Sequence, residues 1–150
     1  LRYALAVWTV NATEQVRVVG NLGYRFDEHF NLAAGIGATP GTRSLMGSHP
    51  YWLANDRVMA DEYFRPGFTG GVWAEGLVVD TLYYKFMIGN NISQLGVSAN
   101  ELTRDLAYSG SLWWMPTTGE FGPKGAYGDW EWHDEVATRF GISGTYSQED

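Results

Sequence analysis

The chain has 150 residues, and its ten Lys and Arg against seventeen Asp and Glu give a formal net charge of −7. This length fits one domain, and the acidic balance argues against a nucleic-acid partner, whose phosphates require a basic surface. The absence of cysteine excludes disulfide scaffolds, thiolate metal sites and cysteine nucleophiles. Charged residues make up only 18% of the chain, which also contains nineteen Gly and seven Trp. That composition indicates β-structure with an atypical exterior.

Alternation of apolar and polar residues recurs along the chain and predicts about seven β-strands. Between residues 15 and 26 the even positions are mostly apolar, and the odd positions are polar or small. The predicted strands are residues 1–10, 15–26, 30–37, 68–75, 82–89, 105–114 and 137–146. Most have close to the roughly 9–11 residues that a tilted membrane-spanning strand needs. The pattern therefore predicts an all-β fold, an antiparallel meander.

The polar face of these strands distinguishes a membrane sheet from a soluble one. It is largely Gly, Ala, Ser and Asn with isolated charges, a mixture that a water-filled lumen accepts. Aromatic residues gather near predicted strand ends, as at Tyr24, Phe26 and Phe30, where they would form an interfacial girdle. Long loops near residues 39–66 and 90–104 alternate with short turns, as in outer-membrane barrels. We therefore predict that residues 1–150 form one segment of an antiparallel transmembrane β-barrel.

Three stretches resemble the porins of Gram-negative outer membranes: residues 64–76 (FRPGFTGGVWAEG), 89–97 (GNNISQLGV) and 113–122 (WWMPTTGEFG). The likeness is greatest to the phosphate-selective porin O/P type, and as a pattern it covers most of the chain. It implies an outer-membrane location among lipid and lipopolysaccharide, passive diffusion of small solutes or ions, and a homotrimer. Such porins have roughly sixteen to eighteen strands, more than are predicted here, so we expect a segment of a longer chain.

A channel of this kind requires no enzyme activity, cofactor or metal. Its selectivity would depend on charges of the polar face, and the predicted pore-lining residues are Arg17, Arg25, Glu75, Lys85, Asp105 and Arg139. The loop near residues 39–66 either folds into the lumen or stays on the surface. If it folds inward, it forms a constriction whose charged residues are Arg43, Asp56, Arg57, Asp61, Glu62 and Arg65.

Two other interpretations remain open. A soluble β-sandwich or small barrel could bind carbohydrate or another small ligand through the rings of Trp52, Trp73, Trp113, Trp130 and Trp132. A hydrolase built on such a sheet could instead use Asp56, Asp61 and Glu62 as acid and base, or with His49 hold a metal. Nothing in the sequence fixes the distances between these carboxylates, so the channel is the favoured interpretation.

Overall fold

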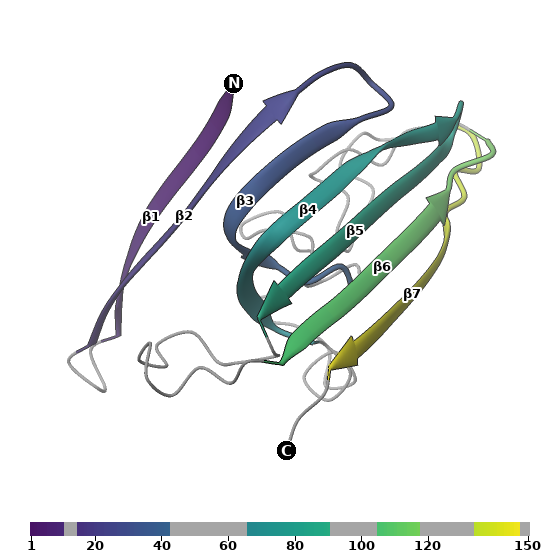
Figure 1. Cartoon of the computed structure of the whole chain (residues 1–150). Helices are drawn as coiled ribbons and strands as arrows, with labels where there is room; N and C mark the ends of the chain where they lie inside the picture. Colours follow the sequence, from purple (N-terminus) through teal and green to yellow (C-terminus); the bar gives the residue numbers. More distant parts are fainter. Residues whose placement is uncertain (11–14, 43–65, 91–104, 118–133, 148–150) are drawn as a thin grey trace.

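The computed structural model describes residues 1–10, 15–42, 66–90, 105–117 and 134–147. For residues 8–10 and 15–17 it describes the backbone but not the side chains. The described residues form one sheet of seven strands in the order β1 to β7, each antiparallel to the next (Figure 1). The strands are β1 (Arg2–Val10), β2 (Gln15–Arg25), β3 (Asn31–Ala38), β4 (Phe68–Val79), β5 (Leu82–Asn90), β6 (Leu106–Trp114) and β7 (Phe140–Ser147). The predicted all-β antiparallel meander is therefore confirmed.

Two strand boundaries differ by more than one residue from the sequence-based expectation. β4 continues to Val79 through a register shift after Leu77, so the connection to β5 shrinks to Asp80 and Thr81, the latter at φ 70°. β7 begins at Phe140 rather than near residue 137. The Thr138 amide donates to the Thr117 Oγ1, at 2.8 Å, and this directs the backbone to a side chain instead of a neighbouring strand.

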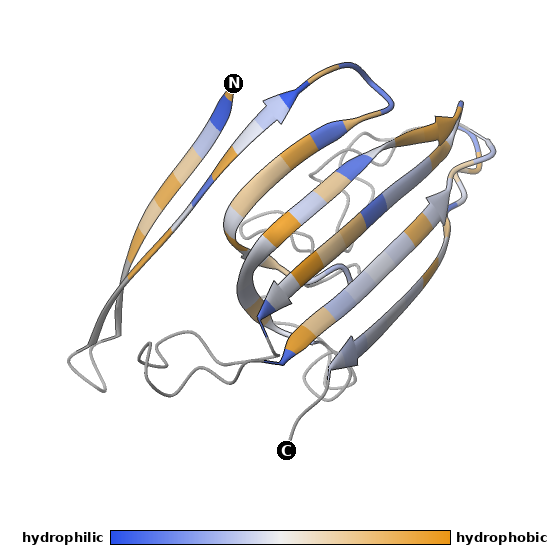
Figure 2. Ribbon diagram, viewed as in Figure 1, coloured by the Kyte–Doolittle hydropathy of each residue, from blue (hydrophilic) through white to orange (hydrophobic). Residues whose placement is uncertain are grey.

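The register places successive residues of each strand on opposite faces of the sheet. One face, here called the inner face, carries Asn21, Trp73, Lys85, Met87 and Ser109. Along β6 the inner-face residues Ala107, Ser109 and Ser111 are buried, while the intervening Tyr108 and Leu112 on the outer face are exposed. Bands of differing hydropathy alternate along the strands in Figure 2. The period of two in the sequence therefore corresponds to the two faces.

A row of small residues crosses the middle of the inner face, where Gly35 pairs with both Asn21 and Gly71, and Gly71 pairs with Gly89. Gly35 has φ +136°, a conformation that side chains disfavour. A Cβ at Gly35 would overlap the Gly20 carbonyl oxygen, and one at Gly71 would overlap the Ile88 carbonyl oxygen. Glycine lets these backbones approach each other, and β3 and β4 curve strongly (Figure 1).

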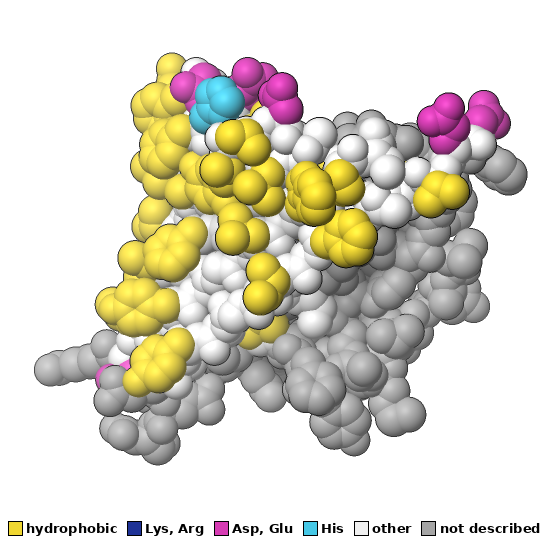
Figure 3. Space-filling view, turned by 90° about the vertical axis from the view of Figure 1, so that its right-hand side faces the viewer, with side chains coloured by type: hydrophobic (Ala, Val, Ile, Leu, Met, Phe, Trp, Pro, Cys, Tyr) yellow, Lys and Arg dark blue, Asp and Glu magenta, His cyan; other side chains and the backbone are white. Residues whose placement is uncertain are grey.

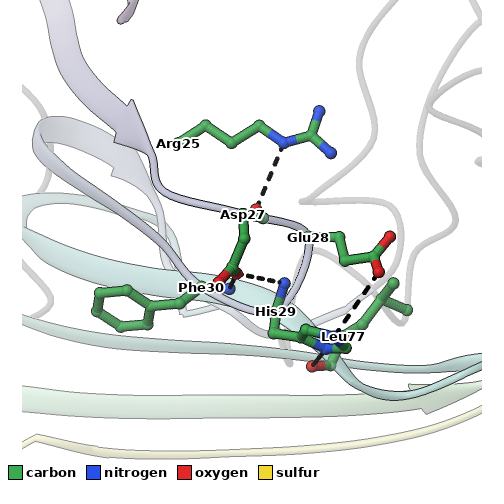
Figure 4. Close-up of polar contacts among 6 residues, drawn as sticks. All are labelled: Arg25, Asp27, Glu28, His29, Phe30 and Leu77. Carbon is green, nitrogen blue, oxygen red and sulfur yellow. Dashed lines mark hydrogen bonds and ion pairs between the residues drawn. The ribbon is translucent and has the colours of Figure 1, made fainter.

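The turn between β2 and β3 is closed by a side chain and docked onto β4 (Figure 4). The Asp27 carboxylate accepts the backbone amides of His29 and Phe30, at 2.8 and 2.7 Å. The Leu77 amide donates to the Glu28 carbonyl oxygen, and the Leu77 carbonyl oxygen lies 3.1 Å from the His29 Nδ1. This turn therefore holds the β2–β3 end of the sheet against β4.

Candidate functional site

Every charged residue of the described strands lies on the inner face. Register positions place Arg25 beside Asn31, Asn31 beside Glu75, and Glu75 beside Lys85. The Lys85 Nζ is 3.4 Å from Glu75 Oε2 and 5.4 Å from the centre of the Trp73 ring. Arg2 and Arg17 take the same face through their pairings with Gly23 and Trp8. The inner face therefore concentrates the ionic groups of the sheet.

The remaining two predicted pore-lining residues lie just outside the strands. Arg139 precedes β7, and its guanidinium sits over the inner-face ring of Trp113, 5.2 Å from the ring centre. Asp105 precedes β6 and is half-buried, without a paired strand partner. The structure thus brings Arg25, Glu75, Lys85 and Arg139 to one side of the sheet and leaves Asp105 at its margin.

The predicted constriction residues all lie outside the described residues, but the beginning of their loop is described. Thr39 and Pro40 are fully buried, and the Thr39 amide donates to the Gly67 carbonyl oxygen at 3.1 Å. The Ser109 Oγ donates to the Pro40 carbonyl oxygen at 2.6 Å. Because Ser109 is an inner-face residue of β6, this segment leaves β3 on the inner side of the sheet. Its described part is therefore directed inward.

The outer face is apolar and, in the described strands, uncharged. Its large apolar side chains are exposed, for example Phe86 at 45% and Leu112 at 44%. Figure 3 shows hydrophobic side chains gathered along one side of the molecule, with acidic ones at the edge. The exposed outer-face side chains are Tyr3, Leu5, Val7, Val18, Leu22, Tyr24, Leu32, Val72, Phe86, Ile88, Leu106, Tyr108, Leu112, Trp114, Phe140, Ile142 and Tyr146.

Aromatic rings cluster where the outer face meets the edge with the β2–β3 and β4–β5 turns. The Tyr24 and Phe26 rings are 4.8 Å apart between centres, and Phe26 and Phe30 are 5.5 Å apart. Farther along the same edge, the rings of Trp114 and Phe140 are 5.9 Å apart. The aromatic residues that the sequence groups around residues 24–30 are thus contacting rings at one end of the sheet.

A second aromatic group lies on the inner face, where sequence analysis named Trp113 as a ligand-binding ring but not its stacking partner Tyr83. Tyr83 and Trp113 are cross-strand partners on β5 and β6, and their rings are parallel to within 4° with centres 5.6 Å apart. Both rings line a cavity of about 430 Å³ together with Arg2, Arg25 and Glu75. The alternation in the sequence already places Tyr83 and Trp113 on the polar face of the sheet. That the two rings are neighbours follows only from the register between β5 and β6.

No protein-family model, curated protein or solved structure matches the chain. Within the described ranges, no helix is long and apolar enough to cross a membrane, and no group of three His, Asp or Glu side chains is placed to hold a metal ion. The candidate acid, base and metal residues His49, Asp56, Asp61 and Glu62 lie outside the described residues.

Proposed function

We propose that this sheet is part of an outer-membrane β-barrel that conducts small solutes or ions by passive diffusion. The observation that supports it is the difference between the two faces: the charged residues of the described strands lie on the inner face, and the outer face is apolar and exposed. Soluble monomers rarely expose contiguous apolar patches beyond roughly 300–600 Å². In a bilayer the same surface faces hydrocarbon, where an Arg or Lys at the midplane would cost about 2–4 kcal/mol.

The direction of the strands supports a larger barrel. Because each strand is antiparallel to the next, β1 and β7 run the same way and cannot close the sheet by antiparallel pairing. We infer that an odd number of further strands joins these two edges, which gives the even total usual for bacterial barrels. In this proposal the partners are outer-membrane lipid and lipopolysaccharide, the assembly is a homotrimer, and passage needs no catalytic group or cofactor.

Ion conductance in planar bilayers tests the proposal. We expect the full-length protein, folded in detergent, to produce discrete current steps that increase linearly with voltage. The double variant Phe86→Arg and Leu112→Arg adds two charges to the outer face and should no longer insert, because an arginine that faces hydrocarbon costs up to about 4 kcal/mol, depending on its depth. Absence of current from folded wild-type protein would contradict the channel.

A further inference from the structure

The inner face contains a stepped aromatic surface beside a cavity. The rings of Tyr83 and Trp113 are parallel to within 4°, and a centre separation of 5.6 Å means that they are offset rather than superimposed. Both line the cavity of about 430 Å³, and Trp113 also lines a neighbouring cavity of about 250 Å³. The volume of the larger cavity lies within the range typical of small-molecule sites. The aromatic surface therefore adjoins two hollows.

The described residues around the larger cavity carry charges of both signs. They are Arg2 and Arg25 against Glu28 and Glu75, and Glu75 is also paired with Lys85. Asn31 also lines this cavity. Its Oδ1 is buried and accepts no hydrogen bond from the described residues, while its Nδ2 donates to the Glu75 carbonyl oxygen. Guanidinium donors and carboxylate acceptors in one cavity suit a ligand rich in hydroxyl groups, because a hydroxyl group both donates and accepts hydrogen bonds.

We propose that the Tyr83–Trp113 surface and its cavity bind a pyranose ring of a neutral saccharide. The negative faces of the aromatic rings attract the C–H groups of the sugar, which are partially positive. Hydroxyl groups at the sugar edge reach the Arg2 and Arg25 guanidinium groups. Transport of that saccharide rests on the proposed channel, whereas binding does not. The position of Trp113 between two cavities suits a sugar that moves along the inner face.

Saccharide block of the ion current tests both transport and binding in the full-length protein. We expect maltose to reduce the open-channel current of wild-type protein reversibly. The half-blocking concentration should rise on the order of tenfold in Trp113→Leu and in Tyr83→Leu, because each loses one ring face. The matched control is Trp114→Leu, which removes the adjacent ring from the outer face and should change that concentration by less than about twofold.

Gluconate serves as the anionic comparison, and saturation-transfer NMR in detergent measures maltose binding without any current. Gluconate block stronger than maltose block would overturn the saccharide assignment in favour of an anion site. An open channel that maltose neither blocks nor binds would overturn it while leaving the proposed channel intact. Maltose binding that is lost in Trp113→Leu, but without current from any variant, would support the saccharide site and refute the channel.

Discussion

Replacing Lys85 with glutamate is expected to shift the ion selectivity of the channel towards cations. The Lys85 Nζ lies 3.4 Å from the Glu75 carboxylate, and the lysine side chain is only 18% exposed. The substitution turns this ion pair into two neighbouring carboxylates, where confinement reduces screening by salt. The cation-to-anion permeability ratio should rise roughly severalfold to tenfold, as measured by reversal potential in a salt gradient.

Two further variants separate the effect of the site from that of net charge. The double variant Glu75→Lys and Lys85→Glu keeps one charge of each sign and should return the reversal potential close to that of wild type. Asp80→Lys changes the charge by the same amount in the exposed turn between β4 and β5 and should have little effect. An unchanged potential in Lys85→Glu, or an equal and opposite one in Asp80→Lys, would show that Lys85 does not line the conduction path.

Replacing Gly35 with alanine is expected to cost the folded sheet at least about 3 kcal/mol, or to prevent folding. Gly35 has φ +136°, and an added Cβ would lie 2.6 Å from the Asn21 Cα and overlap the Gly20 carbonyl oxygen. These neighbours are backbone atoms that cannot rotate away. The loss would be measured as the shift in the free energy of unfolding by urea titration of the folded, lipid-bound protein.

The control for this variant is Gly144→Ala. Gly144 is an outer-face residue of β7, and an added Cβ there meets no atom within 4 Å. Its cost should remain within about 0.5 kcal/mol, as for most exposed substitutions. If the two alanine variants were equally stable, the close approach of β2 and β3 at Gly35 would be contradicted.

Much of the sheet could be predicted from the sequence because its two faces differ so strongly. The alternation around Val16–Tyr24 and Leu82–Ile88 was long enough to fix which residues share a face, and it placed Arg25, Glu75 and Lys85 together. The ends of strands were less predictable. At Thr138 the apolar alternation continues, yet a hydrogen bond to Thr117 sets the start of β7 two residues later.

Contacts between distant segments could not be predicted. The hydrogen bond from Ser109 to the Pro40 carbonyl oxygen joins residues 69 positions apart, and no local pattern specifies it. Parallel rings at Tyr83 and Trp113 depend on the register between β5 and β6, which a long connection separates. Gly35 was recognisable as a small residue of the polar face, but its positive φ and its part in the curvature depend on the backbones beside it.

The central claim is that the outer face contacts lipid and the inner face water, and paired spin labels on neighbouring residues test it most directly. Labels at Phe86 and Ile142 probe the outer face, and labels at Lys85 and the exposed Ser143 probe the inner face. In membranes, oxygen should relax the first pair more strongly, and a water-soluble nickel chelate should relax the second. Equal access of the nickel chelate to all four positions, or the reverse pattern, would contradict a membrane barrel.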